Sequence, residues 1–317
     1  MSASFWVEML GAEIRFTDAG GHRTRSLVAG AGNPVILLHG ITGHAETWIR
    51  NLGALGTHHR LHALDMLGHG FTAKPDIDYD VPALGRHVLA YMDACGIDTA
   101  IVAGQSLGGW VAGWIAVNHP DRVRGYASIT GAGLEVSKDA AELSRTVGAK
   151  VASATRKATG APTRDSVRER LEWLMFDKSV VTEELVDTRF RIYSDPEFMA
   201  ISGGMVANMT GGGGWRLTRE NLARITCPAL VFWSRQNPTM PWEVGEEASR
   251  IIPDARWYLM EDAGHWPQFE KPAEFNGVMG SFLREVSGTP ERKAPSCAPD
   301  QASAGTAASS NSASRSG

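Results

Sequence analysis

The stretch Ala100-Ile-Val-Ala-Gly-Gln-Ser-Leu-Gly-Gly109 decides the fold. A short apolar run there leads into a Gly-x-Ser-x-Gly pattern, and the following segment, 108–118, is typical of a helix. We therefore expect Ser106 on a sharp turn between a strand and a helix, in a strained backbone conformation. Gly104 and Gly108 are expected because the strand and the helix pass too close together for side chains. Such a turn exposes the Ser106 hydroxyl at the end of a sheet.

Outward from this turn, short apolar runs alternate with helix-length segments. Strands are expected at 34–38, 60–65, 100–103, 125–129, 228–233 and 256–260, and helices at 83–95, 108–118, 242–251 and 272–286. Continuous apolar runs separated by helices indicate a mostly parallel sheet that is covered on both faces. The chain is therefore expected to belong to the α/β class.

Two regions break this alternation. Residues 134–210 are charged and helical in character, with no strong strand run, so we expect a helical lid inserted before the last strands. The core then consists of residues 1–133 and 211–286, and the glycine run 211–214 predicts a flexible connection between lid and core. Residues 287–317 contain no large apolar side chain, which predicts a disordered tail.

Composition excludes several classes of function. The 317 residues carry a net charge of -4, which gives no basic surface for nucleic acid. No apolar run approaches the roughly 20 residues that span a bilayer, and residues 1–10 do not read as a signal peptide. Three widely spaced cysteines, at 95, 227 and 297, match neither a disulfide framework nor a zinc site, so we expect a cytoplasmic protein. We expect a small-molecule substrate, no metal and no cofactor, because no metal constellation and no dinucleotide fingerprint appear.

Two further residues complete a candidate catalytic triad. His265 follows the last expected strand, which matches the chain order nucleophile, acid, histidine, and makes it the expected general base for Ser106. Asn237 occupies the position of the acid, just past the fifth strand. An amide oxygen accepts the imidazole N–H and sets its tautomer, but it does not stabilise an imidazolium by charge.

Three explanations of the missing acid remain open at this point. The chemistry tolerates Asn237, or Glu135 or Asp139 beyond the fourth strand serves instead, or the chain is a weak enzyme, an engineered form or a ligand-binding protein.

An oxyanion formed on an attacked carbonyl needs two N–H donors. The Leu107 amide lies at the expected helix N-terminus, and the Ile41 amide, in the loop that starts at His39, is the expected second donor. Each donor is typically worth about 2.7–4 kcal/mol in the transition state. His39 itself is expected to brace this loop rather than to react.

Taken together, these segments resemble the α/β-hydrolase superfamily over residues 14–286. The resemblance rests on the His39-Gly40 loop, Asp65-Met-Leu-Gly-His-Gly70, the Ser106 turn and Gly264-His265-Trp266. It implies the α/β-hydrolase fold, with a mostly parallel central sheet, helices on both faces and a helical lid.

A narrower resemblance is to the meta-cleavage product hydrolases, which cut C–C bonds in ring-opened aromatic dienones. It rests on the segment 176–190, on 264–270 and on 106–109. The resemblance implies that Arg189 binds the carboxylate of a 2-hydroxy-6-oxo-dienoate and that Trp266 lines the site. Gln105, which stands where that family commonly has Asn, is expected to contact the substrate. The family often forms dimers, so a homodimer or higher homo-oligomer is expected.

Three positions depart from the pattern of that family. The loop after His39-Gly40 reads Ile-Thr-Gly instead of a glycine-rich run, Gln105 precedes the nucleophile, and Asn237 replaces the acid. Despite these departures, the resemblance implies a serine-dependent C–C bond hydrolase of aromatic catabolism. A carboxylesterase for small neutral esters and a catalytically weak ligand-binding homologue are the alternatives.

Overall fold

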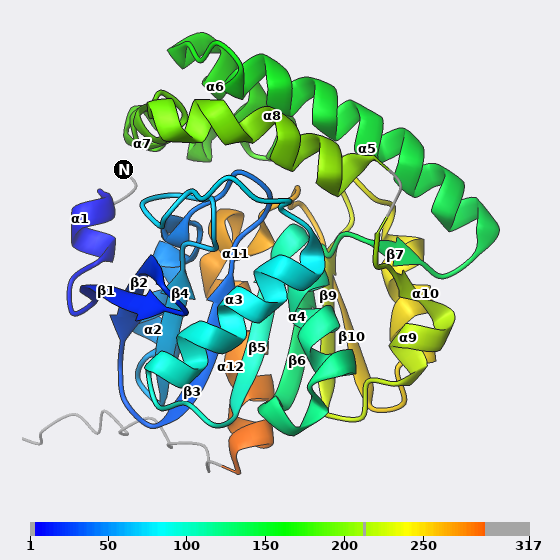
Figure 1. Cartoon of the computed structure of the whole chain (residues 1–317). Coiled ribbons are helices and arrows are strands. Elements are labelled where there is room, and N and C mark those ends of the chain that lie inside the picture. Colours follow the sequence, from blue (N-terminus) through cyan, green and yellow to red (C-terminus); the bar gives the residue numbers. More distant parts are fainter. Residues whose placement is uncertain (1–3, 212–213, 289–317) are drawn as a thin grey trace, which may run out of the picture.

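The computed structural model describes residues 4–211 and 214–288 of the chain, and a twisted, mostly parallel sheet runs through this part (Figure 1). The order of its eight strands is β1-β2-β4-β3-β5-β6-β9-β10. The hairpin β1–β2 pairs antiparallel with the rest, and every later neighbour is parallel. The strands are β1 (Glu13–Ala19), β2 (His22–Ala29), β3 (Asn33–Leu38), β4 (His59–Leu64), β5 (Ala100–Gln105), β6 (Val123–Ile129), β9 (Ala229–Ser234) and β10 (Ala255–Met260).

Helices cover both faces of the sheet because its central strands are apolar on both sides. In β3, Ile36 and Leu38 face one hydrophobic core, and Val35 and Leu37 face the other. The first core includes residues of α3 (Val81–Ala94), α4 (Leu107–Asn118) and α10 (Trp242–Ile251); the second includes residues of α2 (Ile49–Leu55) and α12 (Pro272–Ser287). This arrangement confirms the predicted sheet with helices on both faces.

The predicted strands and core helices match the observed ones to within a few residues, but the β1–β2 hairpin was not predicted. Its first strand lies at the sheet edge and is largely exposed, and its second begins with the polar run His22-Arg-Thr-Arg25. Neither strand therefore shows the continuous apolar run that marks the buried parallel strands.

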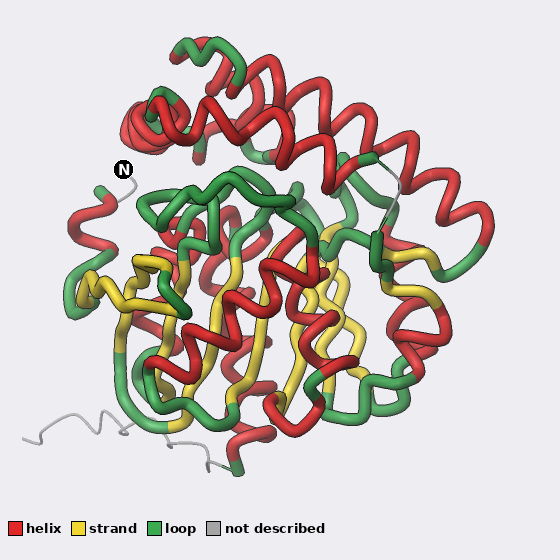
Figure 2. Tube along the Cα trace, viewed as in Figure 1, coloured by secondary structure: helices red, strands yellow, loops and turns green. Residues whose placement is uncertain are grey.

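Four helices between β6 and β9 lie over the carboxyl ends of the strands (Figure 2). Each begins at a side chain that caps it: Ser137, Thr163, Thr182 and Asp195 accept hydrogen bonds from backbone N–H groups of the first turn. A small parallel pair, β7 (Leu134–Glu135) with β8 (Leu217–Thr218), lies at their base. The helices are α5 (Lys138–Thr159), α6 (Arg164–Leu174), α7 (Glu183–Tyr193) and α8 (Pro196–Thr210).

The helices α5–α8, which we call the lid, have an apolar core of their own. Val167, Leu171 and Val186 are buried there, and Trp266 and Phe269 of the core domain pack into the same cluster. The lid is therefore attached to the loop that follows β10. Of the predicted tail at 287–317, Ser287 ends helix α12 and Gly288 caps it, whereas residues 289–317 lie outside the described residues, as does the middle of the predicted glycine connection, 212–213.

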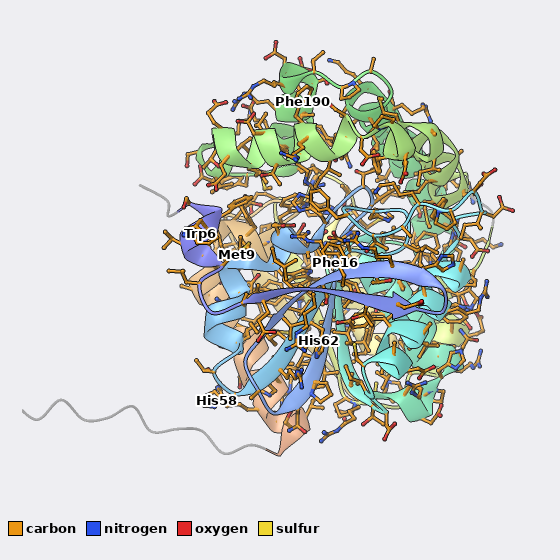
Figure 3. All side chains as sticks on the ribbon, turned by 60° about the vertical axis from the view of Figure 1, so that its left-hand side comes forward. Trp6, Met9, Phe16, His58, His62 and Phe190 are labelled. Carbon is orange, nitrogen blue, oxygen red and sulfur yellow. The ribbon has the colours of Figure 1, made fainter. Side chains whose placement is uncertain are left out.

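Large apolar side chains are exposed at the N-terminal end of the described chain. Trp6 on α1 (Phe5–Glu8) and Phe16 on the edge strand β1 project from this side of the molecule, with Phe190 of the lid above them (Figure 3). The expected homo-oligomer stays a prediction.

Within residues 4–211 and 214–288, no helix has the length and apolarity needed to cross a bilayer. The remaining short elements are η1 (Ala45–Trp48), η2 (Pro120–Arg122), η3 (Lys178–Val180), α9 (Arg219–Ala223) and α11 (Pro267–Glu270).

Candidate active site

Ser106 lies on the tight turn between β5 and α4, as the glycine spacing predicts. Its backbone has φ 55° and ψ -117°, a conformation that costs a non-glycine residue about 1–3 kcal/mol. Hydrogen bonds from Ser106 N to the Ile129 carbonyl (3.0 Å) and from Trp110 N to the Ser106 carbonyl (3.2 Å) hold it there. A Cβ on Gly104 would lie 2.0 Å from the backbone of Gly108, so the turn requires a glycine at this position.

His265 and Asn237 come together in the loops that follow β10 and β9. The Nδ1 atom of His265 lies 2.9 Å from Oδ1 of Asn237 and 3.2 Å from Oγ1 of Thr239. Since an amide oxygen only accepts hydrogen bonds, the imidazole carries its proton on Nδ1 and Nε2 is left as the acceptor. This is the tautomer that a general base for a serine hydroxyl requires.

The loop around Asn237 is built for an amide. Its Nδ2 donates to the Met240 carbonyl (3.0 Å), while Oδ1 also accepts from the backbone N–H (3.2 Å) and the hydroxyl (3.0 Å) of Thr239. A carboxylate at this position would place a negative oxygen against the Met240 carbonyl. The other two acids considered from the sequence form no hydrogen bond with His265 among the described residues: Glu135 lines the same cavity but forms an ion pair with Arg216 (3.2 Å), and Asp139 is exposed at the start of α5.

Without a carboxylate partner, His265 lies in an environment that opposes protonation. Burial, together with the positive charge of Arg170, lowers the pKa of His265 to about 3. The imidazole is therefore neutral at ordinary pH and available as a base. The imidazolium that forms during proton transfer receives no charge stabilisation from Asn237.

The expected oxyanion donors lie beside Ser106. Leu107 is the first residue of α4, so its N–H has no partner within the helix, and Ile41 lines the same cavity as Ser106. The ring of His39 braces the Ile41 loop, because Nε2 accepts from the Met66 amide (3.0 Å) and Nδ1 contacts the Gly40 carbonyl (2.7 Å).

A buried ionic network lies behind this loop. Arg25 pairs with Asp65 (3.0 Å) and with Glu46, and His44 contacts Glu46 (2.6 Å). Asp65 also accepts the Ala45 amide (2.7 Å). These contacts fix the backbone that follows the Ile41 loop, and they give Asp65 of the Asp65–Gly70 motif a structural role.

Arg189 of α7 points its guanidinium under the lid and into the site. It is 2% exposed, donates to the Thr42 carbonyl (2.7 Å) and lies over the ring of Trp266, with 4.8 Å from Cζ to the ring centre. Its Nη1 also reaches the Tyr193 hydroxyl (3.3 Å) and its Nη2 the Thr47 hydroxyl (3.5 Å), whereas its Nε has no hydrogen-bond partner among the described residues. No carboxylate of the described residues forms an ion pair with it, so no acid in this part of the chain neutralises its charge directly.

Gln105 lies in the cavity wall, but its amide is occupied by the protein. Its Nε2 donates to the His265 carbonyl (2.9 Å) and lies 3.4 Å from the Thr130 hydroxyl, which also donates to that carbonyl (2.9 Å). These contacts position the His265 loop. The substrate contact expected for Gln105 stays a prediction.

A cavity of about 110 Å³ lies beneath the lid, at the position of the candidate catalytic serine. Its wall includes Ser106, His265, Arg189 and Trp266, and also Arg170 of α6 and Tyr193 of α7, which the sequence reasoning missed. A signal for Arg170 was present, because it shares the buried face of α6 with Val167, Leu171 and Leu174 at helical spacing. Because charged side chains are rarely buried unless they are paired, an arginine on an apolar helix face indicates a specific role.

Other reactive side chains give no second candidate centre in the part of the chain that the structure describes. No group of three or more His, Cys, Asp or Glu side chains there is arranged to hold a metal ion. Cys95 and Cys227 are free thiols, each partly buried, and burial raises the pKa of Cys227 to about 11. A thiol with so high a pKa is a poor nucleophile.

Known proteins of similar sequence and structure share this architecture. The family described as alpha/beta hydrolase fold matches residues 33–272. A 2-hydroxy-6-oxo-6-(2'-aminophenyl)hexa-2,4-dienoic acid hydrolase of Metapseudomonas resinovorans is 28% identical over 275 residues, which cover 85% of this chain and 90% of that protein. A 2-hydroxymuconate semialdehyde hydrolase of Pseudomonas sp. strain CF600 is 27% identical over 84% of this chain and 93% of its own length.

A solved structure gives the same picture. The crystal structure of a serine hydrolase involved in carbazole degradation superposes with a TM-score of 0.75 and 28% identity, covering 86% of this chain and 99% of that one. The predicted fold and the predicted hydrolase class are thereby confirmed.

Proposed function

Because the chain belongs to the α/β-hydrolase family, we propose that it is a serine-dependent enzyme that hydrolyses a C–C bond in a 2-hydroxy-6-oxo-dienoate-type ring-fission product. Ser106 is the nucleophile, His265 the base and Asn237 the third triad member. Similar proteins that bear the names of such hydrolases support this substrate class.

The observation that carries the proposal is the buried guanidinium of Arg189. A fully buried cation without a carboxylate partner is costly, and an anionic ligand removes that cost. A guanidinium pairs with a carboxylate through two parallel N–H···O bonds. Arg189 lines the cavity that contains Ser106 and His265, so a carboxylate bound there leaves the rest of a short substrate beside the nucleophile.

The reaction needs a proton transfer and an acyl transfer. The dienol first ketonises, as its 2-hydroxyl proton is lost and carbon 5 is protonated with the help of His265. The Ser106 hydroxyl then attacks the carbonyl at carbon 6 and passes its proton to His265, and the amides of Ile41 and Leu107 stabilise the oxyanion. When the bond between carbons 5 and 6 breaks, its electron pair moves to the oxygen on carbon 2, which takes the proton from His265, and 2-hydroxypenta-2,4-dienoate leaves. Water then hydrolyses the ester on Ser106, which releases the carboxylic acid and restores the serine.

An asparagine at position 237 is compatible with this chemistry. It holds the imidazole tautomer through the 2.9 Å contact with Nδ1. The substrate itself is acidic and conjugated, so it supplies part of the activation that a carboxylate gives a serine protease. A neutral, unconjugated ester gives no such help.

The direct test is spectroscopic. Purified protein mixed with a 2-hydroxy-6-oxo-6-phenylhexa-2,4-dienoate should remove the yellow dienoate absorbance, and benzoate and 2-hydroxypentadienoate should appear in equal amounts. The Ser106→Ala variant is the control. Unchanged absorbance with the intact protein would rule out the proposed substrate class.

The two alternatives predict different results. A carboxylesterase would hydrolyse p-nitrophenyl esters faster than the dienoate, and Arg189→Gln would affect both substrates equally. A ligand-binding homologue would leave Ser106 unlabelled by a fluorophosphonate, because an unactivated serine reacts slowly. We expect rapid labelling that the Ser106→Ala and His265→Ala variants lose.

A further inference from the structure

Arg170 is a second buried cation in the cavity wall. It lies on the apolar face of α6 and is 6% exposed. Within residues 4–211 and 214–288 it forms no ion pair, unlike the buried Arg25, which contacts both Glu46 and Asp65. Its Nη1 has no hydrogen-bond partner. A buried guanidinium with an unused donor is costly unless something else supplies the acceptor.

Arg170 and Arg189 both line the cavity, and both charges act on Tyr193 in the same wall. Although burial raises it, the charges of Arg189 and Arg170 together bring the pKa of Tyr193 down to about 8. The Tyr193 hydroxyl is therefore close to both guanidiniums, and it also contacts the hydroxyl of Thr42 (3.0 Å). The charge of Arg170 also lowers the pKa of His265, and both residues line the same cavity.

Below the Tyr193 pKa of about 8, the described residues that line the cavity offer these cations no free counter-ion. Among the described lining residues the one carboxylate is Glu135, and Arg216 already pairs with it at 3.2 Å. A ligand with a single carboxylate satisfies Arg189 but leaves the free Nη1 of Arg170 without an acceptor. The cavity thus favours a ligand that brings a second oxygen acceptor close to its carboxylate.

We propose that Arg170 is a second substrate-binding residue, which takes the oxygen on carbon 2 while Arg189 takes the adjacent carboxylate. Arg170 then selects 2-hydroxy or 2-oxo acids over acids that lack this oxygen. The assignment of the two oxygens rests on the proposed function. A guanidinium donates hydrogen bonds and accepts none, so Arg170 favours the keto form, in which the oxygen on carbon 2 is purely an acceptor.

Binding measurements without catalysis test this proposal. In a Ser106→Ala background, calorimetry would compare phenylpyruvate, 3-phenylpropanoate and 3-phenylpropanamide, which carry a 2-oxo acid, a plain acid and a neutral amide. With Arg170 intact, phenylpyruvate should bind about tenfold more tightly than 3-phenylpropanoate, as expected for one added hydrogen bond to a charged group. The Arg170→Met variant should reduce this ratio to near one while 3-phenylpropanoate changes less than about threefold.

Two further variants separate charge and position. Arg170→Lys keeps the charge but loses the planar fork, so it should retain part of the preference. Arg168→Met removes a cation from the same helix that pairs with Glu183 at the surface, and should leave all three affinities unchanged. Arg189→Met should weaken both acids relative to the amide.

Other outcomes overturn the proposal. An unchanged phenylpyruvate preference in Arg170→Met, or an equal loss for all three ligands, would show that Arg170 only supports the packing of α6. These results are separable from the proposed function. If the native protein hydrolyses the dienoate and the Arg170→Met variant still prefers phenylpyruvate to 3-phenylpropanoate, the proposed function holds and Arg170 lacks this role. If the native protein leaves the dienoate intact but Arg170→Met loses the phenylpyruvate preference, Arg170 binds the oxygen on carbon 2 and the C–C bond chemistry is wrong.

Discussion

The site has two halves that are built in different ways. One half contains Ser106, His265 and Asn237, and we call it the sheet-edge half because it lies where the carboxyl ends of the buried strands β5, β9 and β10 meet. Several hydrogen bonds tie it to the backbone. The lid half, with Arg170 and Arg189, comes from helices and holds charges that the protein leaves without carboxylate partners. Under the proposed function, the first half supplies chemistry that any acyl compound can use, and the second selects the compound that enters.

Removal of the nucleophile should have the largest effect and should affect all substrates alike. Ser106→Ala should lower kcat at least about 10⁴-fold on both the dienoate and p-nitrophenyl acetate, because both need the same acyl step. Steady-state kinetics on the two substrates checks this. If Ser106→Ala kept only its dienoate hydrolysis, water would attack the dienone without the serine. The sheet-edge half would then act differently on the two substrates.

Removal of the lid charge should be substrate-selective. Arg189→Gln should lower kcat/KM for the dienoate by about 10²-fold, as expected for a lost charged hydrogen-bond pair. The ester should lose less than about tenfold, since there the change is the loss of the brace on the Thr42 carbonyl. Arg191→Gln, an exposed arginine on the same helix, is the matched control. Equal losses on the two substrates would contradict the assignment of specificity to the lid.

A restored acid should change the pH profile of the sheet-edge half. His265 must be neutral to act as a base, and its pKa of about 3 predicts that ester kcat/KM stays level as the pH falls to about 4. A carboxylate 2.9 Å from Nδ1 favours the imidazolium, so Asn237→Asp should raise this pKa and move the acidic limb to higher pH.

The same variant should have a modest effect on rate. At pH 7.5 the ester rate should rise by about tenfold or less, well short of the factor of about 10⁴ in a serine protease, because the new oxygen faces the Met240 carbonyl. The dienoate rate should rise less than the ester rate. Profiles of kcat/KM from pH 4 to 8 for both proteins measure the two effects. An acidic limb near pH 6.5 in the native protein, unmoved by the substitution, would contradict this description of His265.

Glu270 connects the two halves, and its substitution should have the smallest effect on rate. Its carboxylate accepts the amides of Phe176 (2.8 Å) and Asp177 (3.1 Å) at the end of the lid helix α6, and that of Gly264 (2.9 Å) beside His265. In Glu270→Gln one oxygen becomes a donor, so the free energy of unfolding should fall by about 1–3 kcal/mol.

Turnover by Glu270→Gln should change less than about threefold. Denaturant unfolding, with the exposed Glu274→Gln as control, measures the loss of stability. A large loss of activity at unchanged stability would place Glu270 in the chemistry.

The sheet-edge half could largely be read from the sequence. Ser106, Asn237 and His265 each follow an apolar run that reads as a buried strand, and the carboxyl ends of parallel strands meet at one edge. Local patterns therefore carried long-range information. The antiparallel hairpin β1–β2 was not predicted, because an exposed edge strand has no such pattern.

The lid half was less visible in the sequence. Arg189 was predicted from a resemblance, and Arg170 was missed, although its position on the apolar face of α6 marks it as unusual. Which charges face one another across α6 and α7 depends on how helices from separate segments pack, and no local pattern encodes that packing. The same limit applies to the hydrogen bond between Asn237 and the Met240 carbonyl, which shows that the loop holds an amide.

The central claim is that two buried arginines direct a general acyl-transfer site toward carboxylated dienones. The most direct test is the ratio of kcat/KM for a 2-hydroxy-6-oxo-dienoate to that for p-nitrophenyl acetate, measured on the native protein and on a variant with both Arg170→Met and Arg189→Gln. We expect a ratio well above one that falls by at least about 10²-fold in the double variant. A native ratio below one, or a ratio that the double substitution leaves unchanged, would contradict the claim.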